Sequence, residues 1–201
     1  MEKLNLGFYE RKNVLKIAKE LLGKVLTTNF DGIKTSGRIV ETEAYNGVID
    51  RASHAWAGRR TARNEVMYKS AGIAYVYICY GMHHLFNVVT NDEEIPHAIL
   101  IRAVEPLLGV DTMLKRTGKK QLDRTLTSGP GNVAKALGIS VKDSGLNLLG
   151  DKIYIADDGF KYSPKQIAEG PRIGVESAGD HALLPYRYYV RGNQFVSGKR
   201  N

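Results

Sequence analysis

A glutamate and a tyrosine two residues apart, Glu43 and Tyr45, are the side chains of this sequence best suited to chemistry. The surrounding letters, GRIVETEAY, alternate apolar and polar residues, as a strand with one buried face does. Side chains two apart on a strand point the same way, so we expect Glu43 and Tyr45 on one face. The other face would hold Val40, Thr42 and Ala44. A carboxylate can activate a water, and an aromatic ring beside it can stack on a flat ligand. Together they predict hydrolysis at a nucleobase.

The composition favours an anionic partner. The 201 residues carry a net charge of +8 with a pI near 9.5, while 43% hydrophobic and 25% charged residues are ordinary for a globular protein. A positive surplus of this size is typical of proteins that bind nucleic acid or anionic membranes, although a merely basic protein would share it. We find no repeat and no linker, so we expect a single domain over residues 1–201.

Other residue types exclude several classes of protein. The single cysteine, Cys79, rules out an internal disulfide and a cysteine-rich zinc site. His83, His84 and His97 lack metal-site spacing with carboxylates, so we expect no metal. The apolar stretch Ile73–Met82 is too short to cross a membrane, and the N-terminus lacks the apolar run of a signal peptide. These features predict a soluble protein inside the cell.

Hydrophobic patterning predicts more strands than helices. Asp31-Gly32, between two strand-like segments, is a strong hairpin signal, and residues 46–72 are typical of loop with short helix. We therefore expect an α+β domain whose curved, mainly antiparallel sheet is surrounded by helices. The expected strands are residues 24–30, 33–45, 75–80, 84–90, 97–105, 152–156, 172–175 and 187–190, and the expected helices are 11–22, 111–117 and 132–137.

Residues 75–80, followed by a turn at Gly81, predict a protruding β-hairpin with a tyrosine at its tip. That tyrosine, Tyr80, would be exposed and could act as a wedge between base pairs in the minor groove. Each of these residues also has an ordinary interpretation. Glu43 could be a solvated glutamate, the tyrosines could be sheet aromatics, and His54 could be a structural histidine.

A set of separate motifs with matching spacing runs through the chain in a fixed order. They are Glu43-Ala-Tyr45, His54, Gly58–Asn64, Tyr75–Met82, Asn87, Ile101–Pro106, Ser128–Pro130, Arg172–Val175 and Tyr189–Gly192. In this combination they resemble the alkyladenine DNA glycosylase family, the 3-methyladenine DNA glycosylases of mammals and many bacteria. The resemblance extends from about residue 5 to residue 198, and the compact chain is more similar to bacterial members. It implies a fold similar to the C-terminal domain of methionyl-tRNA formyltransferases.

The resemblance implies a monofunctional purine DNA glycosylase of base excision repair. Members flip a damaged purine out of duplex DNA and hydrolyse its N-glycosidic bond with water, without a cofactor, which leaves an abasic site. By this resemblance Glu43 is the general base that activates the water, and Arg102 and the backbone carbonyl of Ile173 help to hold it. The implied lesions are alkylated or deaminated purines, namely 3-methyladenine, 7-methylguanine, hypoxanthine and ethenoadenine.

The resemblance also implies an aromatic cage around the flipped base, made of Tyr45, His54 and Tyr77. Stacking tolerates several base shapes but favours a cationic ring, which alkylated purines have. Asn87 matches the residue that crowds the guanine 2-amino group and so disfavours undamaged guanine. Neutral lesions need protonation of the leaving base, and the sequence does not identify that acid.

For double-stranded DNA, the resemblance places Tyr80 in the gap left by the flipped nucleotide, with Met82 beside it on the hairpin tip. A wedge of this kind offsets part of the cost of flipping, which is a few kcal/mol. Arg59 and Thr61 match a segment that touches backbone phosphates. Ser128-Gly129 opens a helix whose N-terminal amides suit a phosphate.

Two departures from the mammalian pattern concern these DNA contacts. Gly131-Asn132 stands where mammalian relatives have a lysine, so one phosphate contact is in doubt. His83-His84 replaces aromatic residues after the hairpin tip, so the tip would hold DNA differently.

Two other functions are compatible with the same residues. The first is a non-catalytic sensor of damaged nucleic acid, because stacking aromatics and positive charge bind DNA without catalysis. The second is a different hydrolase or transferase on a related fold, because fold alone does not fix function. A glycosylase would act as a monomer, in the cytoplasm at the nucleoid of a bacterium or in a eukaryotic nucleus.

Overall fold

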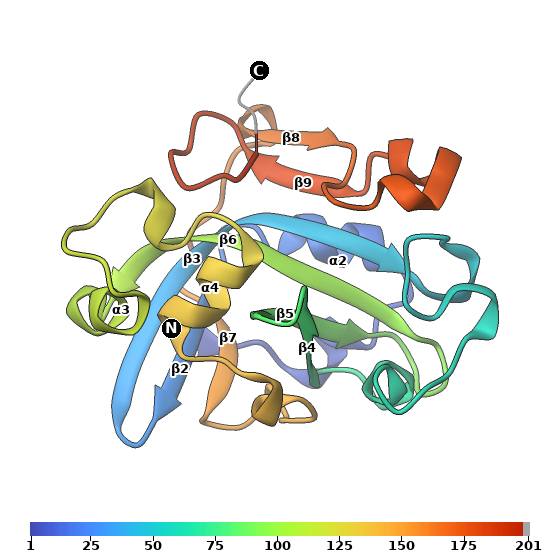
Figure 1. The fold of residues 1–201 in the computed structure, drawn as a ribbon, viewed down its shortest axis with the longest axis horizontal. Coiled ribbons are helices and arrows are strands. Elements are labelled where there is room, and N and C mark those ends of the chain that lie inside the picture. Colours follow the sequence, from blue (N-terminus) through green and yellow to red (C-terminus); the bar gives the residue numbers. More distant parts are fainter. Residues whose placement is uncertain (199–201) are drawn as a thin grey trace.

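The fold is built around one sheet whose strands all pair antiparallel. The computed structural model describes residues 1–198. The strand order is β1-β7-β2-β3-β6-β5-β4, and β9 pairs with both β3 and β8 (Figure 1), which confirms the predicted α+β class. The strands are β1 (Glu2–Lys3), β2 (Val25–Phe30), β3 (Ile33–Asn46), β4 (Ala74–Cys79), β5 (His83–Thr90), β6 (His97–Leu108), β7 (Ile153–Asp157), β8 (Ile167–Gly170) and β9 (Arg187–Val190).

Helices pack on the sheet and enclose the main core. Helix α2 packs on β3 and β6, helix α4 packs on β5 and β6, and α3 packs on α4. In Figure 1, α2 lies behind the sheet, whereas α4 lies in front of it. The α-helices are α1 (Leu6–Tyr9), α2 (Val14–Glu20), α3 (Val110–Thr117) and α4 (Pro130–Leu137), and short 3-10 turns occupy residues 47–49, 56–58, 65–68, 124–126, 141–143, 164–166 and 176–183.

The hairpin between β2 and β3 has the predicted turn. Asp31 and Gly32 both have positive φ values, 53° and 79°, and Phe30 pairs with Ile33 across the turn. Two left-handed central residues define a turn whose twist matches that of the flanking strands. This tight connection starts the long strand β3, which carries Glu43 into the molecule.

A bulge in β3 changes which side chains share a face. The pairing of β3 with β6 shifts register across residues 39–41, so Val40 has no partner of its own. Val40 belongs to the small cluster that contains Phe195, whereas Ala44 belongs to the main core. The prediction that Val40 shares a face with Thr42 and Ala44 is therefore wrong for Val40, because an extra residue reverses the alternation.

The strand predicted at residues 172–175 is also wrong. These residues form an irregular loop, and the strand in this region is β8, which ends at Gly170. The Ile173 N–H donates to the side chain of Glu43 at 2.8 Å, so it does not enter a sheet ladder. Residues 172–175 therefore belong to a loop that contacts Glu43, and not to a strand.

The hairpin of β4 and β5 lies at one edge of the sheet. The segment between β3 and β4 is loop with short 3-10 turns, as predicted.

Among residues 1–198, no helix has the length and apolar character needed to span a bilayer.

Candidate active site

Glu43 lies at the centre of the candidate site and has no exposed surface. Its Oε1 accepts a hydrogen bond from the Ile173 N–H at 2.8 Å and lies 3.3 Å from Nη1 of Arg102. Its Oε2 accepts a hydrogen bond from the Tyr45 hydroxyl at 2.9 Å. Strand β3 thus supplies two neighbouring side chains, as expected, while β6 and the loop after β8 bring the other partners from far along the chain.

The environment of Glu43 makes its carboxylate a stronger base. Burial raises the pKa of Glu43 above its ordinary value, and the charge of Arg102, the Ile173 N–H and the Tyr45 hydroxyl only partly oppose this rise. A carboxylate with a raised pKa can take a proton from water more readily. The observed contact of Ile173 uses its N–H, and the role expected for its carbonyl stays a prediction.

A cavity of about 730 Å³ lies beside Glu43. This volume is in the range of ~300–1,000 Å³ that is usual for ligand sites. Tyr45, Arg102 and Ile173 line the cavity, and Glu43 lies behind them. The three groups that hold the carboxylate are therefore also part of the cavity wall.

Aromatic rings form much of this wall. The rings of His54 and Tyr77 meet edge to face at 4.6 Å, and Nδ1 of His54 lies 2.7 Å from the Tyr75 hydroxyl. The Arg172 guanidinium lies over the Tyr45 ring, 4.8 Å from the ring centroid. The three cage residues expected from the resemblance thus lie around one cavity, and Tyr75 joins them.

The imidazole of His54 is neutral at physiological pH. Burial, with smaller effects from Arg63 and Arg59, lowers the pKa of His54 to about 4. A neutral ring can stack against a cationic base without electrostatic repulsion. The structure therefore offers a cage wall that carries no charge of its own at this position.

Asn87 lies at the cavity with a fixed amide. It is 2% exposed, and its Nδ2 donates to the carbonyls of Tyr75 at 3.1 Å and Leu85 at 3.3 Å. Within the described chain no donor reaches its Oδ1. The amide oxygen is therefore the group that Asn87 can direct toward a bound base.

The tip of the β4–β5 hairpin exposes the predicted wedge. Tyr80 is 85% exposed and Met82 is 71% exposed. Tyr80 and Gly81 have positive φ values, 50° and 72°, and the N–H of Met82 donates to the carbonyl of Cys79 at 3.2 Å. A tight left-handed turn thus holds the tyrosine side chain away from the protein.

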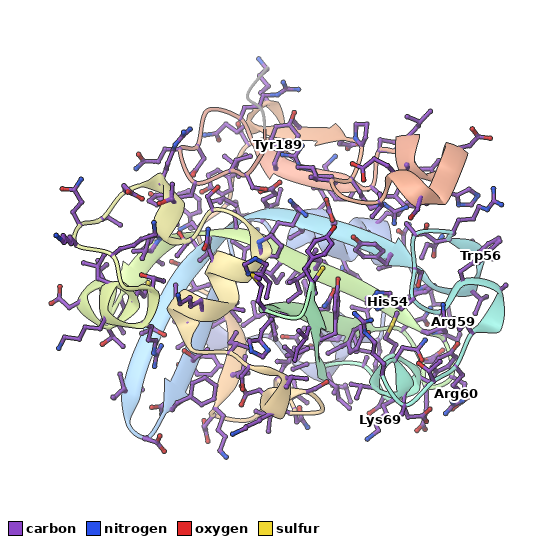
Figure 2. All side chains as sticks on the ribbon, in the orientation of Figure 1. His54, Trp56, Arg59, Arg60, Lys69 and Tyr189 are labelled. Atoms are coloured by element: carbon purple, nitrogen blue, oxygen red, sulfur yellow. The ribbon has the colours of Figure 1, made fainter. Side chains whose placement is uncertain are left out.

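The other expected DNA contacts lie at or next to the cavity. Arg59, Thr61 and Gly129 line it, and Figure 2 shows His54, Trp56 and Arg59 together on the segment between β3 and β4. The Thr61 hydroxyl donates to Oδ1 of Asn64 at 3.0 Å, and this hydrogen bond helps to order the loop. Ser128 lies outside this cavity and lines a smaller one beside it.

Two buried carboxylates near the site, Glu41 and Asp50, form ion pairs that are absent from the sequence prediction. Glu41, on the same strand as Glu43, contacts Arg102 and Arg187. Asp50 makes a double hydrogen bond with Arg172, at 2.5 and 2.8 Å. The two-residue spacing of Glu41 and Glu43 is a signal that could have placed both carboxylates on one face, whereas no local pattern points to the arginines.

Known proteins share this chain's sequence over nearly its whole length. The model of the methylpurine-DNA glycosylase family matches residues 7–194. A Bacillus cytotoxicus protein is 46% identical over 94% of this chain and 97% of its own length. A Desulfitobacterium hafniense protein is 43% identical over 99% of this chain and 100% of its own. A Clostridium perfringens protein is 40% identical over 98% and 100%.

Each of these three relatives carries the provisional name 3-methyladenine DNA glycosylase. The family match covers far more than half of the chain, and the expected family is confirmed. The chain belongs to the methylpurine-DNA glycosylase family.

Proposed function

We propose that this protein is a monofunctional purine DNA glycosylase that hydrolyses the N-glycosidic bond of damaged purines with a water activated by Glu43. Family membership gives the enzyme class, a DNA-3-methyladenine glycosylase. The observation that carries the mechanism is the fully buried Glu43, which the Tyr45 hydroxyl, the Ile173 N–H and the Arg102 cation hold from the wall of an aromatic-lined cavity.

Glu43 has the properties that this hydrolysis requires. Departure of a purine leaves a sugar with oxocarbenium character, as in other glycoside hydrolysis. A carboxylate beside that centre stabilises the positive charge and accepts a proton from the attacking water. Arg102 and the Tyr45 hydroxyl hold the carboxylate in one orientation, so the base needs no rearrangement during the reaction.

Water, and not an amine, is the attacking group. A glycosylase that forms a Schiff base needs a lysine at the sugar. Arginines but no lysine occur among the residues of the described chain that line the cavity. The enzyme therefore releases the base without forming a Schiff base and leaves an intact abasic site.

The cage selects damage by charge and by shape. Alkylation at N3 or N7 gives the purine a positive charge, which attracts the faces of tyrosine rings and weakens the glycosidic bond. Tyr45 and Tyr77 offer such rings, and neutral His54 adds no opposing charge. The proposed substrates are 3-methyladenine and 7-methylguanine, together with the neutral lesions hypoxanthine and ethenoadenine.

Duplex DNA approaches over the hairpin tip and the arginine-rich rim of the cavity. Arg51, Arg59 and Arg63 line the cavity and suit neighbouring phosphates. Tyr80, exposed on its turn, fills the gap left by the flipped nucleotide. One cavity accepts one base, so a monomer is sufficient for the reaction.

Base release from duplex DNA tests this proposal. Duplexes that carry one of the four lesions are incubated with the wild type, with Glu43→Gln and with Glu93→Gln. Glu93→Gln is the control, because Glu93 is exposed and does not line the cavity. The wild type and the control should release free base. Glu43→Gln should lose ~10²–10⁴-fold in rate, the usual contribution of a general base, and still bind the lesion.

Two outcomes would contradict the proposal. Equal release by Glu43→Gln would refute the role of the carboxylate. Tight binding of all four duplexes by the wild type without any release would show a damage sensor instead of an enzyme. The order of the release rates gives the substrate range.

A further inference from the structure

A second buried carboxylate, Glu41, lies two residues before Glu43 on β3 and has no exposed surface. Its Oε1 accepts hydrogen bonds from Nε of Arg187 at 2.6 Å and from Nε of Arg102 at 3.3 Å. Its Oε2 accepts a hydrogen bond from the Ser197 N–H at 2.7 Å. Glu41 therefore contacts the same arginine as Glu43.

Arg102 is shared between the two carboxylates. Its Nε faces Glu41 and its Nη1 faces Glu43, each at 3.3 Å, while its Nη2 donates to Oγ of Ser197 at 3.2 Å. A guanidinium is planar, so a partner that fixes Nε also fixes the direction from which Nη1 approaches. Arg102 lines the cavity and Glu41 does not, so Glu41 can act on the cavity wall through Arg102, in addition to the direct effect of its charge on Glu43.

We infer that Glu41 is a positioning residue for hydrolysis: together with Arg187, it sets how much of the Arg102 charge reaches Glu43. This inference rests on the proposed role of Glu43 as the general base. If Arg102 turned entirely to Glu43, it would stabilise the ionised carboxylate and make it a weaker base. Sharing the arginine with Glu41 keeps Glu43 basic while the guanidinium still holds its place in the cavity wall.

The charges around Glu43 agree with this division. Burial has the largest effect on the pKa of Glu43 and raises it, while Arg102 lowers it and Glu41 raises it by smaller amounts. Charged or titratable groups face Glu43 from the strands and the loop packed around it; they are Glu41 and Tyr45 on β3, Tyr77 on β4, Arg102 on β6 and Arg172 after β8. Glu41 pairs with both Arg102 and Arg187, so Arg187 is linked to Arg102 through Glu41.

Two substitutions should displace the pH profile of the enzyme in opposite directions. In Glu41→Gln, Arg102 is left to Glu43 alone, so the pKa of Glu43 falls and the acid limb of the profile moves to lower pH. In Arg187→Gln, Glu41 loses its other cation and draws on Arg102 more strongly, so the acid limb moves to higher pH. General destabilisation would not produce opposite signs.

The assay is the single-turnover rate of 7-methylguanine release across pH, because this cationic base leaves without protonation. We expect each limb to move by at least about half a pH unit, which is about threefold in rate below the midpoint. Arg187→Lys should retain most of the wild-type profile, since it keeps the charge. Arg191→Gln, an exposed neighbour of β9, is the matched control and should not move the limb.

The outcomes separate this inference from the proposed function. Wild-type limbs in both Glu41→Gln and Arg187→Gln, with Glu43→Gln inactive, would overturn the role of Glu41 alone. An active Glu43→Gln would overturn the proposed mechanism itself. If Glu41→Gln melts too low to assay, Arg187→Gln decides, because the buried Glu41 then still keeps Arg102 and the Ser197 N–H as partners.

Discussion

Replacing Tyr45 with phenylalanine separates two roles that one side chain combines. The ring lines the cavity, and the hydroxyl donates to Oε2 of Glu43 at 2.9 Å. Phenylalanine keeps the ring and removes the donor. Tyr77→Phe is the matched control, because Tyr77 lines the same cavity but donates no hydrogen bond to any residue of the described chain.

The size of the effect follows from the bond that is lost. A hydrogen bond to a charged group contributes roughly 1.5–3 kcal/mol. Each ~1.36 kcal/mol is tenfold in rate, so the expected loss is about 10- to 100-fold on the acid side of the profile. The hydroxyl stabilises the ionised form and so lowers the pKa of Glu43; without it the pKa rises further, and activity recovers as pH increases.

Single-turnover release of 7-methylguanine, measured for both variants across pH, checks this prediction. Lesion binding should change little in either variant, since both keep the aromatic ring. If Tyr45→Phe and Tyr77→Phe gave the same profile, the hydroxyl would have no role in holding the base, and the argument from geometry would fail.

Two further predictions concern stability and DNA distortion. Asp50→Asn removes the carboxylate partner of the buried Arg172 guanidinium and should cost ~3–5 kcal/mol of unfolding free energy, measured by denaturant titration. Burial opposes the ionisation of Asp50, but Arg172 outweighs burial and holds the pKa of Asp50 below its ordinary value. The stabilisation by this ion pair should therefore be lost as pH falls through the lowered pKa. A wild-type stability that does not change with pH in acid would contradict this prediction. Tyr80→Ala should leave the melting temperature unchanged, because the side chain is 85% exposed, yet slow base release from duplex DNA; equal rates for the variant and the wild type would exclude a wedge.

Local signals in the sequence were enough to predict most of the sheet. The turn at Asp31-Gly32 is set by two adjacent residues that tolerate positive φ, and the alternation after it continues to Tyr45. Glu43 and Tyr45 could be placed side by side for the same reason, since their relation is two residues of one strand. The family resemblance then named their chemistry.

Features that depend on distant partners could not be predicted in this way. The bulge at Val40 arises from pairing with β6, some sixty residues later, and it reverses the face of one residue. Residues 172–175 have the composition of a strand, but Arg172 pairs with Asp50, and the N–H of Ile173 pairs with Glu43. In both cases a tertiary contact outweighs the local pattern.

The left-handed turn at the hairpin tip restricts which amino acids can occupy position 80. A φ of 50° is strongly unfavourable for a β-branched residue, so valine, isoleucine and threonine are disfavoured there. Tyr80, whose Cβ is unbranched, adopts this backbone conformation. The backbone of the protein therefore limits which side chains can occupy the proposed wedge position, independently of any contact with nucleic acid.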